Sequence, residues 1–228
     1  QRGSMWQAKF LILALLLGGL ALALPWLAYR RLKSLTRKHG RVLLVRGISG
    51  AQAARIILLR GKIEQVDVDE TSLAITDYYS AFEPAIKLSP ETYHGRTLFD
   101  VARAARLAGH ALQHRDRRLG SQSSWDSFMI LWGNGWPFLL IAFVFMKEGA
   151  LIFGLMTFSV LAAILAAIHA AKHRNIVDAS RRGRAELAAA NLLDGHPREE
   201  LDVAFTAACL ENLALPYTRT WWGMLVGR

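Results

Sequence analysis

Three long runs of apolar residues constrain this chain more than any other feature of its sequence. They cover residues 10–29, 128–146 and 150–171, and they contain no charged residue over 20, 19 and 22 positions. A helix of this length crosses a hydrocarbon layer of roughly 30 Å. The core helix of a soluble protein, in contrast, rarely stays apolar on every face. The runs therefore predict three transmembrane helices.

The first run also resembles a signal peptide, but two features favour an uncleaved anchor. The run is longer than the apolar part of a typical signal peptide, and the basic sequence RRLK follows it directly, as after a stop-transfer segment. Residues 1–4 precede Met5, which we interpret as the natural start. We therefore interpret these four residues as a remnant of cloning and leave them out of the fold prediction.

The positive charges lie where a membrane topology would place them. The net charge is +10, and basic residues follow the first and third runs, at Arg30, Arg31, Lys33, Arg37, Lys38 and Arg41 and at Lys172, Arg174, Arg181, Arg182 and Arg184. The positive-inside rule explains this pattern better than nucleic-acid binding does. It predicts a membrane protein with its N-terminus outside and its middle and C-terminal segments in the cytoplasm. The single cysteine, Cys209, suits a reducing compartment.

The segments outside the membrane predict a small cytoplasmic α+β domain at residues 30–127 and a helical segment at 172–228. Ser49 can cap a helix that Gly61 ends, and Thr97 with Asp100 resembles a capping box. Short alternating or apolar stretches predict three strands. The expected elements are helices at 51–59, 98–115 and 199–213, and strands at 65–69, 72–76 and 85–88, with the third membrane helix continuing past Lys172.

The helix predicted at residues 98–115 contains the sequence AARLAGHALQH, in which His110 and His114 are four positions apart. Two histidines at this spacing on one helix face can bind zinc, and in a metalloprotease of the HExxH type a glutamate after the first histidine is the general base. The partners that His110 needs are absent, because Arg106 stands four positions before it and Leu107 follows Arg106. By itself this pattern does not distinguish a lost metal site from an ordinary helix.

The flanking sequence resembles the bacterial membrane-bound neutral zinc metallopeptidases of the YugP type. The resemblance extends from about Gly47 to Leu213, and its parts occur in the family's order. They are GISGAQAAR, the residues from Ile75 to Ser80, LSPETY, GRTLFDVA, AARLAGHALQ, two membrane helices, NIVDASRRGRAEL and VAFTAACLENLA. The resemblance implies a zincin-like, metallopeptidase-related helical core in a membrane protein.

The same resemblance implies that the metal site has been lost. It places Arg106 at the first histidine ligand, Leu107 at the general base and Ile176 at the third ligand, so that His110 and the nearby Asp178 remain. Leucine and isoleucine cannot bind zinc or transfer a proton, and arginine has no lone pair to offer. We therefore expect a catalytically inactive homologue without a metal cofactor, which acts as a binding, scaffold or regulatory protein.

The loss of zinc also predicts how the site is closed. Asp178 would be a buried carboxylate without a counter-charge, which is costly. Arg106 lies one helical turn from His110, so its guanidinium can reach into the same space and pair with Asp178. We expect this ion pair, with Leu107 and Ile176 filling the remaining volume.

Two alternatives belong to other functional classes. An active metallohydrolase could use His110 and His114 with Asp178 or His173 as ligands, and Asp116 or Glu186 as the base. A lipid-handling or transport protein could use Asn134 and His169, which are polar groups within the apolar runs. Under the leading interpretation, the expected partners are the lipid bilayer and either a membrane protein or a second copy of this chain.

Overall fold

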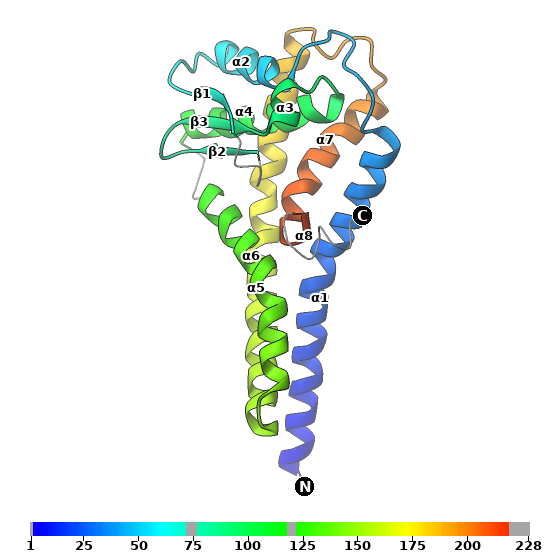
Figure 1. The fold of residues 1–228 in the computed structure, drawn as a ribbon, viewed down its shortest axis with the longest axis vertical. Helices are drawn as coiled ribbons and strands as arrows, with labels where there is room; N and C mark the ends of the chain where they lie inside the picture. Colours follow the sequence, from blue (N-terminus) through cyan, green and yellow to red (C-terminus); the bar gives the residue numbers. More distant parts are fainter. Residues whose placement is uncertain (1, 72–76, 118–121, 219–228) are drawn as a thin grey trace.

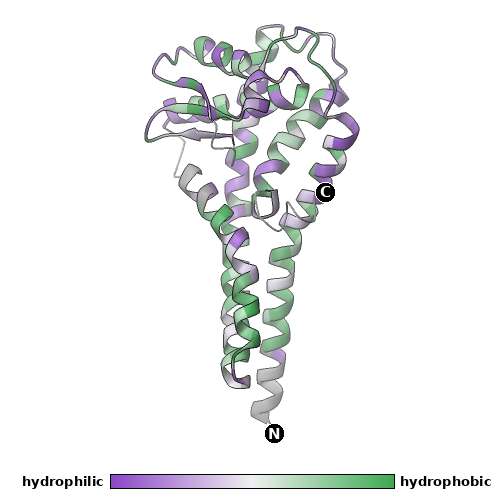
Figure 2. Ribbon diagram, in the orientation of Figure 1, coloured by the Kyte–Doolittle hydropathy of each residue, from purple (hydrophilic) through white to green (hydrophobic). Residues whose placement is uncertain are grey.

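The computed structural model describes residues 2–71, 77–117 and 122–218. Its long axis is formed by α1 (Arg2–His39), α5 (Gln122–Val144) and α6 (Glu148–Ala189), which run side by side in the lower half of Figure 1. We call the apolar parts of these helices, residues 10–29, 128–144 and 149–171, the stalk. Above the stalk lies a head that contains a small sheet and the remaining helices. The two ends of the molecule thus differ in composition, with a largely hydrophobic stalk and a head in which hydrophilic and hydrophobic residues are mixed (Figure 2).

Two stalk helices are long and apolar enough to cross a membrane, judged by length and composition. They are Leu11–His39 of α1 and Gly149–Ala189 of α6. The apolar part of α5, Phe128–Val144, is shorter than a spanning helix usually is. The second apolar run also ends two residues earlier than expected, because Phe145 and Met146 lie in the turn before α6. The expected three spans are therefore reduced to two that meet this test, together with a shorter apolar helix.

The third predicted membrane helix continues into the head, as expected. Helix α6 has 42 residues, and it remains helical past Lys172 and through Gly183. Helix α1 likewise continues past its apolar run to His39. The head is therefore connected to the stalk by two continuous helices.

The sheet lies on one side of the head and contains β1 (Asp67–Glu70), β2 (Tyr78–Ser80) and β3 (Ala85–Leu88). The strand order is β1-β3-β2, with β1 parallel and β2 antiparallel to β3. Strand β3 has the predicted bounds, whereas β1 begins two residues later than expected. Strand β2 was not predicted, and the strand expected at 72–76 lies outside the described residues.

The predicted caps are found at the starts of two helices of the head. Ser49 and Gln52 form a capping box at the start of α2 (Gly50–Arg60), and Thr97 and Asp100 form one at the start of α4 (Leu98–Arg115). The remaining helices are α3 (Pro90–His94), α7 (Arg198–Leu213) and α8 (Leu215–Thr218). Helix α4 is the centre of the head, since it packs against α2, α6 and α7.

Candidate functional site

Helix α4 carries the candidate site, and small residues allow it to approach its neighbours closely. Its sequence from Ala104 to Gln113 is buried without interruption. Ala105 and Gly109 of α4 face Gly183 and Ala179 of α6. A Cβ atom on Gly109 would lie 1.9 Å from the carbonyl oxygen of Ala179, and one on Gly183 would lie 2.0 Å from that of Ala105. The two helices thus run antiparallel, and their backbones are in contact at two points. At each point a glycine of one helix lies against an alanine of the other.

His110 lies next to this crossing, and its orientation is fixed through Gln113. The Gln113 Nε2 amide donates to the backbone oxygen of Asn175 at 2.9 Å and to Asp178 Oδ2 at 2.8 Å. The amide oxygen of Gln113 therefore faces His110 Nδ1, at 2.9 Å. Only a protonated Nδ1 can donate to this oxygen, so the neutral imidazole carries its lone pair on Nε2.

The His110 ring is neutral at physiological pH. It is only 3% exposed, and burial, followed by the positive charge of Arg106, lowers its pKa from 6.5 to about 4. Its Nε2 atom is fully buried and has no hydrogen-bond partner within the described residues. His110 therefore presents an unused acceptor in the interior of the head.

Arg106 is also buried, at 5% exposure, but it does not form the expected ion pair with Asp178. Its Nε atom is buried without a hydrogen-bond partner, and no carboxylate of residues 2–71, 77–117 or 122–218 lies within 4.0 Å of its guanidinium. Asp178 instead accepts from Arg182 Nε at 2.8 Å and from Gln113. The physical reason is local, because Arg182 is one turn from Asp178 on the same helix and pairs with it at little conformational cost.

Leu107 and Ile176, the other two positions that the resemblance assigns to the metal site, are apolar and buried, as expected. Leu107 is 2% exposed and belongs to the main core cluster, and Ile176 is completely buried. No proton or metal chemistry is available to either side chain. A guanidinium and two hydrocarbon side chains do not suit a divalent cation, because none of them offers it a lone pair.

The alternative ligand set is not brought together. His114 Nδ1 contacts the hydroxyl of Tyr79 on β2 at 2.6 Å, whereas His110 is oriented toward α6 by Gln113. Within the described parts of the chain, no three histidine, cysteine, aspartate or glutamate side chains lie close enough to hold a metal ion. The proposed bases are engaged elsewhere, Asp116 with Arg182 and Glu186 with Arg60.

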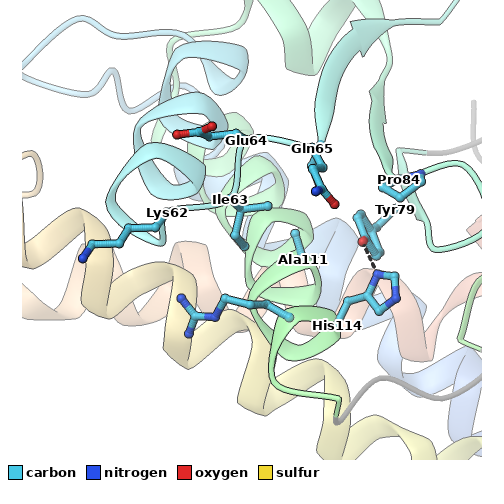
Figure 3. Close-up of a pocket in the computed structure, with 10 residues that line it drawn as sticks. Lys62, Ile63, Glu64, Gln65, Tyr79, Pro84, Ala111 and His114 are labelled. Carbon is cyan, nitrogen blue, oxygen red and sulfur yellow. Dashed lines mark hydrogen bonds between the residues drawn. The ribbon is translucent and has the colours of Figure 1, made fainter.

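His114 instead borders a groove between α4 and the sheet, shown in Figure 3. The groove has a volume of about 440 Å³ and includes Tyr79, Glu64 and Arg115. Burial raises the pKa of Tyr79 to about 12, so its hydroxyl stays protonated. Figure 3 shows Tyr79 and His114 facing each other, with the dashed line between them.

Two residues of this region were not predicted from the sequence. Gln113 holds His110 in place, and the signal for it was its position three residues after the histidine within GHALQ. Tyr79 could not be assigned, because its contact with His114 joins a strand to a helix 35 residues away.

The two polar residues singled out within the apolar runs, Asn134 and His169, both form hydrogen bonds inside the protein. Asn134 donates to the backbone oxygen of Ile130, and His169 contacts Trp125 and the Asn212 carbonyl.

Comparison with known proteins relates this site to a peptidase family. Residues 14–217 match the family model described as "putative neutral zinc metallopeptidase". The chain is 33% identical over 96 residues to the "putative membrane protease YugP" of Bacillus subtilis (strain 168), which covers 42% of this chain and 43% of that relative. No solved structure matches the chain. The two apolar helices and this relative indicate a membrane protein. Since the family model covers most of the sequence, the chain belongs to the neutral zinc metallopeptidase family.

Proposed function

We propose that this chain is a catalytically inactive member of its family, which acts by binding rather than by peptide hydrolysis. The observation that supports this most strongly is the buried guanidinium of Arg106 at the position of a metal ligand. A fixed positive charge repels a divalent cation, and it cannot be deprotonated in a protein. Leu107 at the position of the general base removes the second requirement of the reaction. The proposal retains a zincin-like core in which α4 and α6 supply the former ligand positions.

Purified protein is expected to cleave neither casein nor model peptides, with or without added zinc, and to hold no stoichiometric zinc by elemental analysis. The matched variant restores the family residues through Arg106→His, Leu107→Glu and Ile176→Glu together. We expect this variant to gain zinc, because Nε2 of His110 already presents its lone pair and Gln113 supports the ring from behind. Chelator-sensitive cleavage by the unaltered protein would refute the proposal.

We further propose a multi-pass inner-membrane topology with three spans, an external N-terminus and a cytoplasmic head. Its support is the charge distribution, because the basic residues after residue 29 and after residue 171 lie at the head end of α1 and α6. The short α5 would complete a hairpin with α6. The exposed leucines of the stalk, among them Leu13, Leu16 and Leu20, would then face lipid, a membrane-protein partner or a second copy of the chain.

A topology assay tests this arrangement directly. A reporter fused after Arg228 is expected to be active in the cytoplasm, and one inserted at Glu148 is expected to be active outside. The reverse pattern, or cytoplasmic activity at both positions, would exclude the three-span topology.

A further inference from the structure

A cavity lies inside the stalk, in the half that is nearer to the head. It has a volume of about 210 Å³ and is lined by residues of α1, α5 and α6. On the side of the head it is bordered by Pro216 and Tyr217 of α8, which Figure 1 shows at the head end of the stalk. The α6 side is formed by Ala162, Ala166 and Ala170, whose small side chains leave the space open. Protein interiors seldom contain a void of this size, so the cavity calls for an occupant.

The chemistry of the cavity favours an apolar occupant. Two polar side chains on its border, Tyr217 and His169, bond to the protein itself. Tyr217 donates its hydroxyl hydrogen to the backbone oxygen of Leu22 at 2.8 Å. His169 uses both ring nitrogens, since Nδ1 accepts from Trp125 Nε1 at 3.1 Å and Nε2 lies 3.1 Å from the backbone oxygen of Asn212. A buried water needs about two to four polar partners, so this cavity suits hydrocarbon better than water.

The size and the opening of the cavity indicate where such an occupant comes from. An apolar cavity of roughly 150 Å³ is large enough to bind benzene, so this one can hold a section of a hydrocarbon chain. The cavity reaches the surface of the stalk, because Leu24 and Ala170 on its border are both exposed. The surface beside Leu24 is apolar, since Leu20 and Leu27 are exposed as well. A ligand that enters here therefore arrives from an apolar environment.

The charges at the head end of the stalk give the depth of the cavity in a bilayer. The first lysine or arginine beyond its border is Lys172 on α6, two residues after Ala170, and Arg30 on α1, five residues after Pro25. These charges lie about 3 and 8 Å further along their helices, at the helical rise per residue. Basic side chains at the end of an apolar span reach the lipid headgroups. The cavity therefore lies at the level of the acyl carbons that follow the headgroup. We propose that it binds one acyl chain of a phospholipid from the leaflet on the side of the head.

Photolabelling of the full chain in phosphatidylcholine vesicles tests the proposal, with a phospholipid that carries a diazirine in the upper half of one acyl chain. Trp132 borders the cavity, whereas the adjacent Leu131 is 69% exposed on the outside of the stalk. We expect label on both residues. Ala166→Phe is expected to reduce the label on Trp132 at least about fivefold and to leave that on Leu131 unchanged, because a phenyl ring in the cavity leaves no room for a chain.

Ala167→Phe is the matched control, since Ala167 is exposed at the next position of α6. This variant should leave the label on Trp132 and on Leu131 unchanged. Ala166→Leu fills less of the cavity and should also reduce the label on Trp132, which provides the test if the phenylalanine variant does not fold. Label on Leu131 without label on Trp132, or full labelling of Trp132 in a folded Ala166→Phe or Ala166→Leu protein, would overturn the proposal.

The inference goes beyond the proposed loss of activity, but it rests on the proposed position of the stalk in a bilayer. The two labelled residues separate these statements. Absence of label on both Leu131 and Trp132 would refute the position of the stalk and, with it, this site. Label on Leu131 alone would refute the site and leave the topology intact, and peptidase activity would refute only the proposed inactivity.

Discussion

Replacing Gly109 by alanine is expected to destabilise the protein by about 3 kcal/mol or more, although alanine normally stabilises a helix relative to glycine. The added Cβ would lie 1.9 Å from the backbone oxygen of Ala179, so no side-chain rotation can relieve the overlap. One helix must move, and α4 cannot move without disturbing its packing against α2 and α7. Thermal unfolding in detergent measures the effect.

The matched control is Gly135→Ala in α5, where an added Cβ would meet no atom within 4 Å. This variant is expected to stay within about 1 kcal/mol of the unaltered protein. Gly183→Ala should reproduce the loss seen with Gly109→Ala, because its Cβ would lie 2.0 Å from the Ala105 oxygen. If Gly109→Ala were as stable as Gly135→Ala, the close crossing of α4 and α6 would be wrong.

Two arginine substitutions at the same site are expected to have opposite effects on stability. Arg106→Met removes a buried charge that has no carboxylate partner in the described parts of the chain, and it should stabilise the protein by about 1–3 kcal/mol. Arg182→Met breaks the contacts with Asp178 and Asp116, and it should destabilise the protein by roughly 1–2 kcal/mol. Differential scanning fluorimetry of both variants under identical conditions provides the comparison.

A destabilised Arg106→Met protein would show that the guanidinium has a counter-charge in the folded protein. Asp178→Asn tests the same assignment from the other partner. Its effect should be coupled to that of Arg182→Met in a double-mutant cycle and additive with that of Arg106→Met. Coupling to Arg106 instead would restore the ion pair that the sequence predicted.

The elements of the head that depend on local chemistry were predictable from the sequence. Ser49 and Thr97 cap their helices because a hydroxyl at that position satisfies an otherwise free backbone amide. Strand β2 was not predictable, since it has three residues and β3 is its only partner strand among the described residues. Its position depends on pairing between segments, which composition and periodicity do not encode.

The sequence predicted only part of the candidate site. The burial of Leu107 and Ile176 followed from their chemistry, but the partner of Asp178 was misassigned. Arg182 was present at the i+4 position, which is a readable signal, and it competes better than a residue on another helix. The resemblance to the family drew attention to Arg106, because it places Arg106 at the position of the first histidine ligand. Whether Arg106 or Arg182 lies nearer to Asp178 depends on how the helices pack, and the sequence alone does not give this packing.

The unbroken course of α6 has a mechanical consequence. A helix of 42 residues is about 63 Å long, and this one carries the α4 crossing near its far end while its first half lies in the stalk. A spanning helix responds to bilayer thickness by changing its tilt. A rotation of about 10° about the base of such a rod displaces its far end by about 11 Å, given the rise per residue. Under the proposed topology, a change in membrane thickness would therefore move the head end of α6, and lipids that never touch Arg106 would still shift the helix that faces it.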